Sequence, residues 1–220
     1  MKKINLKKLS VVAILCAIAY VSVFLFKFKV SFLTFDLKDA VLAVTAFLYG
    51  PIYAVCSAAI VSFLEFLTVS DTGVYGLIMN FLSSAVFALC CGLLYKFKRS
   101  LGGAILATIT AVFAMTAIML VANLFVTPFY MGVSRSEVVK LIPSLLLPFN
   151  IIKGVFNASV TMLIYKPITT AVRKAKILEG NSAKINTSKT TLLSAISAIL
   201  ILISLFVIFV LLNGSFSFFK

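Results

Sequence analysis

Long apolar runs follow one another along this chain, and their length constrains the fold more than any other feature. The run Thr190–Leu212, for example, contains no charged residue. A membrane-spanning helix needs about 20 predominantly apolar residues. Hydrophobic residues make up 62% of the 220-residue chain, against roughly 45–50% in soluble domains. The sequence therefore predicts an all-α integral membrane protein.

The runs that precede this one leave one question of topology open. They are Leu9–Phe26, Ala40–Leu48, Ile52–Leu67, Tyr75–Tyr95, Leu101–Val126 and Leu141–Tyr165. Region 40–67 is either one long span or two shorter ones broken at Gly50–Pro51. Two spans place the basic clusters Lys2–Lys8, Lys96–Arg99 and Arg173–Lys176 on one side of the membrane, as the positive-inside rule requires. We therefore predict a six-helix bundle followed by an extra C-terminal seventh helix.

The basic clusters also bear on partners and location. The net charge of +14 is concentrated beside apolar runs, which is typical of loops that face the anionic inner leaflet rather than of nucleic-acid binding. We predict a multi-pass protein with a cytoplasmic N-terminus, the lipid bilayer as its surroundings and no nucleic-acid partner. Leu9–Phe26 is longer than the apolar part of a usual signal peptide and lacks a small-x-small cleavage site, so we read it as an uncleaved helix.

Composition shifts divide the chain into three parts. Residues 1–176 hold the six runs and form the predicted substrate-binding membrane domain. Residues 177–189 include Gly180, Asn181 and Ser182 and are predicted to form a cytoplasmic linker. Residues 190–220 contain the additional helix, which we expect to lie outside any binding pocket.

Two opposite charges lie within apolar runs. Glu65 belongs to the third run and Lys153 to the sixth. A charge at the bilayer centre costs about 2.5–3.5 kcal/mol on insertion scales and usually faces a cavity or a partner. The pair therefore indicates a polar pocket within the membrane, and the alternative is a purely structural ion pair between the two side chains.

Amide side chains strengthen the binding interpretation. Asn80, Asn123, Asn150 and Asn157 lie in or at the ends of apolar runs. An amide offers donors and an acceptor, although many intramembrane Asn side chains only bond a neighbouring helix. Asn150 and Lys153 are three apart and therefore share one helix face. Pro143 and Pro148 precede them and can free backbone carbonyls there.

Catalysis has little support in the residue inventory. The chain has no histidine and no GxxxxGK[ST], HExxH or GxSxG motif. Its four cysteines, Cys16, Cys56, Cys90 and Cys91, lie in apolar runs without a CxxC pair. We predict a non-enzymatic protein without catalytic residues, metal or cofactor. A membrane enzyme acting on a lipid or isoprenoid, with Glu65 and Asp39 as its acids, and a structural membrane protein remain the alternatives from other classes.

The first outer loop, Lys27–Asp39, is too apolar for a plain solvated loop. Its Phe28, Phe32, Leu33 and Phe35 are mixed with charged residues. A re-entrant loop that caps a pocket has this composition, and so does an interfacial aromatic belt. Both interpretations stay open from the sequence.

Several short motifs in residues 5–176 resemble one transporter family. They are Ala13-x-x-x-Ala17, Phe35-Asp36-Leu37-Lys38-Asp39, Ala46-Phe47-Leu48-Tyr49-Gly50-Pro51, Glu65-Phe66-Leu67, Gly76-x-x-Met79-Asn80-Phe81-Leu82, Asn123-x-x-x-Thr127-Pro128 and Leu147-Pro148-Phe149-Asn150-x-x-Lys153-Gly154. This set resembles the substrate-binding S components of bacterial energy-coupling factor (ECF) vitamin transporters, and the riboflavin-specific branch most of all. The run that ends in Lys153-Gly154 is its most specific part.

The resemblance implies a six-helix fold in the bacterial cell membrane with the vitamin bound near the outer face. Its partners would be riboflavin as transported ligand, a transmembrane coupling protein docked partly through Ala13 and Ala17, and two cytoplasmic ATPases. The implied substrate-binding residues are Glu65, Asn123, Asn150, Lys153, Met79, Asn80, Thr34, Phe35, Asp36, Leu37 and Thr127. Another vitamin or a nucleobase-like precursor is the alternative substrate. The seventh helix departs from the family pattern.

Overall fold

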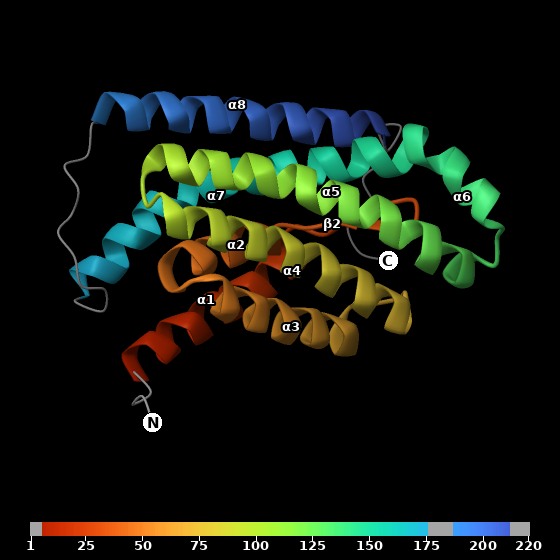
Figure 1. The fold of residues 1–220 in the computed structure, drawn as a ribbon, viewed down its shortest axis with the longest axis horizontal. Coiled ribbons are helices and arrows are strands. Elements are labelled where there is room, and N and C mark those ends of the chain that lie inside the picture. Colours follow the sequence, from red (N-terminus) through yellow and green to blue (C-terminus); the bar gives the residue numbers. More distant parts are fainter. Residues whose placement is uncertain (1–5, 176–186, 212–220) are drawn as a thin grey trace.

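The computed structural model describes residues 6–175 and 187–211, and almost all of them are helical (Figure 1). The elements are α1 (Leu6–Leu25), β1 (Phe28–Val30), β2 (Leu33–Phe35), α2 (Lys38–Tyr49), α3 (Pro51–Thr68), α4 (Gly73–Phe97), α5 (Leu101–Met131), α6 (Arg135–Leu141), the π-helical segment η1 (Ile142–Leu146), α7 (Leu147–Lys174) and α8 (Thr187–Leu211). Six helical segments in the described residues are long and apolar enough to cross a membrane. The predicted all-α membrane bundle is confirmed.

The predicted break at Gly50–Pro51 separates α2 from α3. Gly50 has φ +98°, a backbone conformation that side-chain-bearing residues rarely adopt. Pro51 occupies the first helical position of α3, where its missing N–H leaves no bond unmade. At 1.5 Å per residue, the 12 residues of α2 cover about 18 Å, less than the roughly 30 Å hydrocarbon core. The second predicted span is thus a short helix.

The short α2 forms the centre of the bundle. Eleven of its side chains are buried, from Lys38 at its start to Tyr49 at its end. It packs against α1, α3, α4 and α7. A helix that is covered on all sides needs no polar face, which explains why its sequence reads as a continuous apolar run after Asp39.

The first outer loop folds into a β-hairpin. Strands β1 and β2 pair antiparallel, with Val30 opposite Leu33, so Ser31 and Phe32 form a two-residue turn. Ser31 has φ +58°, as tight hairpin turns require. Phe28, Val30, Leu33 and Phe35 are buried, and the ring of Phe35 packs on Phe149 and Phe156 of α7. The loop is therefore folded into the bundle rather than spread along its surface.

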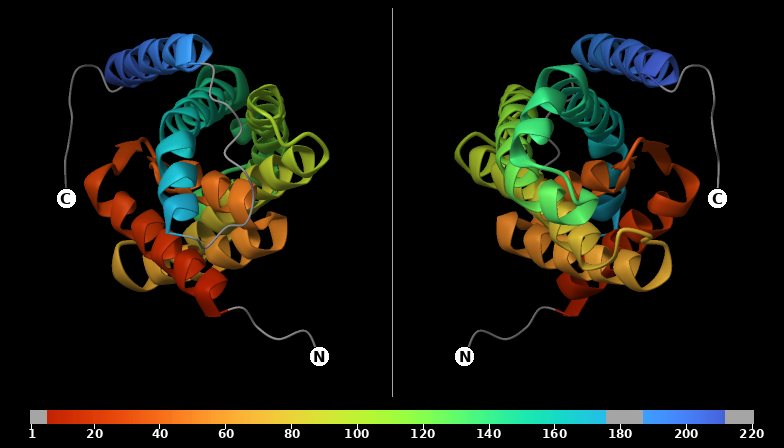
Figure 2. Two further views of the ribbon diagram at one scale, coloured as in Figure 1. Left: turned by 90° about the vertical axis from the view of Figure 1, so that its left-hand side faces the viewer. Right: turned by 90° about the vertical axis from the view of Figure 1, so that its right-hand side faces the viewer.

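The last helix lies at the edge of the bundle. In Figures 1 and 2, α8 runs alongside α7, which is the helix it contacts most. Ser197, Ser204 and Ile208 are buried, while Leu202 and Phe206 face outward. The structure thus places α8 at the edge of the bundle, against α7. The predicted linker 177–189 lies mostly outside the described residues, and the three-part domain division stays a prediction.

Helix α4 approaches α3 closely at one glycine, which gives a stability prediction. A Cβ added to Gly92 would lie 2.8 Å from the Cα of Pro51 and 2.9 Å from its backbone nitrogen. Because the obstacle is backbone, Gly92→Ala must push the two helices apart, and we expect a loss of about 1–3 kcal/mol in stability. Thermal unfolding of the detergent-purified protein measures this loss.

Gly102 in the first turn of α5 provides the matched control. A Cβ there meets nothing within 4 Å, and alanine is the better helix former by up to about 1 kcal/mol. Gly102→Ala should therefore melt at or above the temperature of the unmodified protein. A Gly92→Ala protein as stable as the Gly102→Ala protein would show that the contact with Pro51 does not limit the packing.

Candidate binding site

A cavity opens between the hairpin and the helices α4, α5 and α7. Its lining residues are Phe32, Leu33, Thr34, Thr72, Tyr75, Gly76, Met79, Asn80, Ser83, Met119, Asn123, Val126, Thr127, Tyr130, Phe149, Asn150 and Lys153. Apolar and aromatic walls with a few amides and one cation are typical of a small-molecule site. The cavity leaves about 70 Å³ accessible to water, so its walls are close together.

The sequence-predicted residues divide into two groups. Met79, Asn80, Thr34, Asn123, Thr127, Asn150 and Lys153 line the cavity. Glu65, Phe35, Asp36 and Leu37 are not among its lining residues. The fold brings the first group together from four separate elements because α4, α5 and α7 surround the hairpin.

Asn150 lies just after an irregular part of its helix. The segment η1 holds Pro143, and α7 begins immediately before Pro148. The side-chain amide of Asn150 donates to the carbonyl oxygen of Leu146, the last η1 residue, at 2.7 Å. Its Oδ1 accepts no hydrogen bond within the described residues. π-Helical turns of this kind are frequent at functional sites, and the prolines predicted to distort this region do so.

Asn123 is held by its own helix. Its amide nitrogen donates to Met119 O at 2.7 Å, and its Oδ1 accepts from the Thr127 hydroxyl at 2.8 Å. These bonds fix the orientation of the amide on the cavity wall. An amide has two N–H donors, so one donor stays available for a ligand.

Three aromatic rings gather where the hairpin meets α4 and α5. The ring of Tyr130 lies 6.2 Å from that of Tyr75 and 6.4 Å from that of Phe32, centroid to centroid. All three residues line the cavity. They come from three elements, so a movement of the hairpin would separate Phe32 from the other two rings.

Lys153 connects the cavity to a buried chain of charges. Its Nζ lies 2.8 Å from Asp36 Oδ2 and donates to the carbonyl oxygen of Thr34 at 3.2 Å. Both acceptors belong to the hairpin or the residue just after it. The alternative of a structural ion pair between Lys153 and Glu65 is therefore not what the fold forms.

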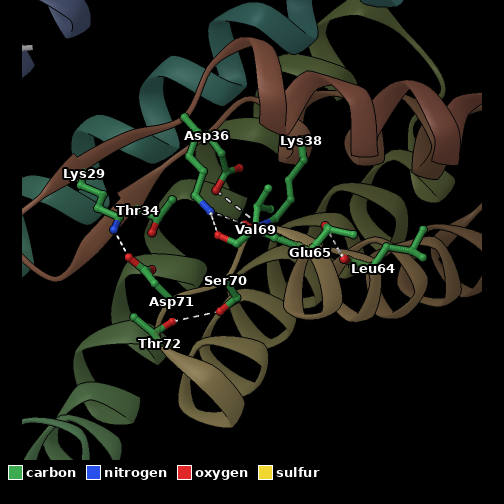
Figure 3. A network of polar contacts seen from close by, with 12 residues as sticks. Lys29, Thr34, Asp36, Lys38, Leu64, Glu65, Val69, Ser70, Asp71 and Thr72 are labelled. Atoms are coloured by element: carbon green, nitrogen blue, oxygen red, sulfur yellow. Dashed lines mark hydrogen bonds and ion pairs between the residues drawn. The ribbon is translucent and has the colours of Figure 1, made fainter. Parts of the chain in front are cut away.

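Lys38 is the centre of this chain of charges (Figure 3). Its Nζ lies 2.6 Å from Glu65 Oε2 and 3.4 Å from Asp36 Oδ2, and its side chain is fully buried. Lys27 lies 4.0 Å from the other Glu65 oxygen and donates to Val69 O at 2.8 Å. Lys27, Glu65, Lys38, Asp36 and Lys153 thus form one network, which we call the charge relay.

The charge relay keeps Asp36 ionised although no water reaches it. Burial alone would raise the pKa of this carboxyl group. The charges of Lys153 and Lys38 outweigh burial and lower the pKa to about 2. The ionised carboxylate therefore attracts Lys153 at every physiological pH.

Helix α7 presents further polar groups to the same segment. The Asn157 amide donates to Asp36 O at 3.0 Å and accepts from the Ala40 N–H at 2.9 Å. The Thr161 hydroxyl bonds Ala40 O at 3.4 Å. Lys153, Asn157 and Thr161 are four residues apart and lie on one face of the helix. This face anchors the junction between the hairpin and α2.

Some residues of the candidate site and of the charge relay were not singled out from the sequence. Lys38 is one, and its position between Asp36 and Asp39 at the start of an apolar run is a signal that could have identified it. Ser83 and Met119 are others: each lies four residues from a predicted site residue, Met79 and Asn123 respectively. Helical periodicity applied to those predictions would have found them.

Comparison with known proteins places this geometry in a family. Residues 7–165 match the family described as ECF transporter, substrate-specific component. The chain belongs to this family. The matched region contains the whole cavity and the charge relay, and α8 lies beyond it.

Two curated relatives and one solved structure are similar along nearly their whole length. The riboflavin transporter RibU of Staphylococcus aureus (strain TCH60) is 32% identical over 186 residues, which cover 79% of this chain and 97% of that protein. The riboflavin transporter FmnP of Bacillus subtilis (strain 168) is 30% identical over 188 residues, covering 79% and 99%. A solved S component of a bacterial ECF transporter has a TM-score of 0.64 at 32% identity, covering 76% of this chain and 97% of that one.

These relatives are transport proteins, in agreement with the prediction that this substrate-specific component is not an enzyme. Membership of the family also implies that it works with ECF partner subunits. The helices that can cross a membrane agree with a membrane location.

The charge relay gives a test of its own. Lys38→Met removes the cation between two buried carboxylates, and breaking a buried pair in this way costs about 3–5 kcal/mol. Lys38→Met combined with Glu65→Gln removes one of the unpaired charges as well. We therefore expect the double variant to be more stable than Lys38→Met alone, as measured by thermal unfolding.

Lys29 supplies the control for this comparison. It forms an ion pair with Asp71, and both side chains are substantially exposed. Surface pairs contribute about 0–1 kcal/mol, so Lys29→Met should change the melting temperature little. Equal losses in Lys29→Met and Lys38→Met would contradict a stabilising role for the charge relay.

Proposed function

We propose that this substrate-specific component captures riboflavin for uptake by an ECF-type importer. The observation that carries the proposal is the convergence of Asn123, Asn150 and Lys153 in one apolar cavity. Similarity to two riboflavin transporters supports it. Riboflavin is the transported ligand here and not a cofactor of a reaction.

The chemistry of the cavity suits a flavin. The isoalloxazine ring is flat and largely apolar, and Met79, Met119, Tyr75 and Phe149 provide apolar and aromatic walls. The pyrimidine edge of the ring alternates acceptors and donors. The free Oδ1 of Asn150 is positioned to accept from this edge, and a remaining N–H of Asn123 can donate to it.

The ribityl chain offers hydroxyl groups that suit the rest of the lining. Asn80 lines the cavity with an amide that both donates and accepts, and the Thr127 hydroxyl, which donates its proton to Asn123, can accept. The Thr34 backbone and the ammonium of Lys153 lie beside them. We propose that these four residues bind the hydroxyls.

A ring of this size does not enter the cavity as it stands. Ligand pockets usually measure about 300–1,000 Å³, whereas this one leaves about 70 Å³ accessible to water. We propose that riboflavin enters when the hairpin moves outward and Phe32 separates from Tyr75 and Tyr130. The exposed ion pair between Lys29 and Asp71 is weak enough to break during this movement.

The proposed movement assigns a role to the predicted residues outside the cavity. Phe35, Asp36 and Leu37 belong to the segment that joins the hairpin to α2. Glu65 pairs with Lys38 in the closed arrangement, so a direct contact between Glu65 and the ribityl chain requires Lys38 to release it. We propose that Phe35, Asp36 and Leu37 contact the ligand only as the hairpin moves.

Two further features support the proposed partners and orientation. Ala13 and Ala17 lie exposed on one face of α1, where small residues permit close approach of another helix. We propose that a transmembrane coupling protein docks there and that two cytoplasmic ATPases drive transport. The start of α1 and the last turns of α4 and α7, which hold Lys96 and Arg173, lie toward the same end of the bundle (Figure 1). This supports a cytoplasmic N-terminus in the bacterial plasma membrane.

Flavin binding can be measured directly by fluorescence. We expect the detergent-purified protein to quench riboflavin fluorescence at micromolar concentration. Asn150→Ala and Lys153→Met should each weaken binding about tenfold or more, because a buried polar group of the ligand loses its partner. Lys140→Met, on the exposed surface of α6, should leave the affinity unchanged.

Thermal unfolding of each variant without ligand separates lost binding from lost folding. A folded protein that fails to quench riboflavin at micromolar concentration would contradict the flavin assignment. It would leave the family membership in place and direct attention to other vitamins.

A further inference from the structure

A second cavity lies at the other end of the bundle, where α1 begins, α2 meets α3 and α4 ends (Figure 1). It leaves about 400 Å³ accessible to water. Its lining residues are Lys8, Ala46, Phe47, Leu48, Tyr49, Gly50, Pro51, Ile52, Gly92, Tyr95, Lys96 and Arg99. None of them lines the riboflavin cavity, so the proposed function does not use this space.

The charge of this second cavity has a single sign. Lys8, Lys96 and Arg99 line it, and none of its described lining residues is acidic. The ammonium of Lys8 also lies 3.9 Å from the ring centroid of Tyr53, just outside the cavity. Three cations around one concave space attract an anion of matching size.

The N-terminus of α3 adds backbone donors to the same space. Gly50 precedes Pro51 and provides no side-chain cap. The N–H groups of Ile52 and Tyr53 lie in the first helical turn, where no preceding helical carbonyl can accept them. The dipole of an 18-residue helix also favours negative charge at this end, and phosphate groups commonly bind such a terminus.

We propose that this second cavity binds the phosphate headgroup of an anionic phospholipid. Lys8, Lys96 and Arg99 would neutralise the phosphate, while the first turn of α3 would donate to its oxygens. The surroundings favour a lipid over a free anion. Ile52, in the lining, is 75% exposed, and Phe97 beside Lys96 is 85% exposed, so both offer apolar surface to acyl chains at the membrane boundary.

Native mass spectrometry and thermal unfolding of the full chain test this proposal. The protein in neutral detergent would receive phosphatidylglycerol, phosphatidylcholine or inorganic phosphate in separate samples. We expect retained phosphatidylglycerol adducts and a higher melting temperature with that lipid alone. Equal protection by phosphatidylcholine, or protection by inorganic phosphate without an effect of phosphatidylglycerol, would overturn the lipid assignment.

Two double variants with the same charge change locate the site. Lys8→Gln/Lys96→Gln alters the second cavity, whereas Lys7→Gln/Lys98→Gln alters neighbouring residues that do not line it. We expect phosphatidylglycerol binding to fall about tenfold or more in the first variant only, since each basic side chain contributes about 1 kcal/mol toward anionic lipid. Equal loss in both variants would indicate general surface attraction and contradict a defined site.

Discussion

The arrangement of the β-hairpin end of the bundle depends on one interaction, the buried ion pair between Lys38 and Glu65. Lys38 begins α2, and Glu65 lies near the end of α3. The 2.6 Å contact between them therefore holds α2 and α3 together at the end opposite the Gly50–Pro51 turn. Asp36 and Lys153 extend the charge relay to the β-hairpin and to α7. One set of charges thus fixes the positions of four elements around the riboflavin cavity.

This arrangement explains why a short helix is tolerated inside a membrane bundle. Helix α2 starts deep in the protein, and the segment before it carries backbone polar groups that lipid would not satisfy. Asn157 and Thr161 bond backbone groups of Asp36, just before α2, and of Ala40, in its first turn, and the two strands of the β-hairpin pair with each other. Helix α2 is too short to cross the membrane alone. The β-hairpin and the polar face of α7 fill the remaining depth and provide hydrogen-bond partners for the backbone there.

The sequence was sufficient to predict the helices but not the contacts between the charges. Apolar run length and the positive-inside rule placed the helices and the break at Gly50–Pro51, because both depend on local composition. The partner of Glu65 depends on how the outer loop folds, and a two-stranded hairpin of three-residue strands leaves almost no periodic signal. Span positions therefore offered a pair between Glu65 and Lys153 as the structural alternative, whereas the pairing of Glu65 with Lys38 became visible only once the loop was folded.

The cavity residues were predictable to different degrees for a physical reason. Asn123, Asn150 and Lys153 are polar residues within apolar helices, and such residues stand out because they are costly in a membrane. Phe32, Tyr75 and Met119 also line the cavity, but apolar and aromatic residues are common on lipid-facing surfaces, so composition alone does not separate them. The rotation of each helix about its own axis decides whether such a residue lines the cavity or faces lipid. Packing against the β-hairpin and α2 sets that rotation.

The two ends of the molecule differ in their balance of charge, and this asymmetry connects the two proposed sites. The acids Asp36, Glu65 and Asp71 lie at the hairpin end, in contact with lysines that balance them. At the other end, Lys8 and Lys96 line a cavity without a described carboxylate. A neutral vitamin suits the first end because the charge relay there is already paired. An anionic headgroup suits the second because three basic side chains line it and none of its described lining residues is acidic. A lipid bound there would hold the α2–α3 turn against α4 while the β-hairpin at the opposite end opens.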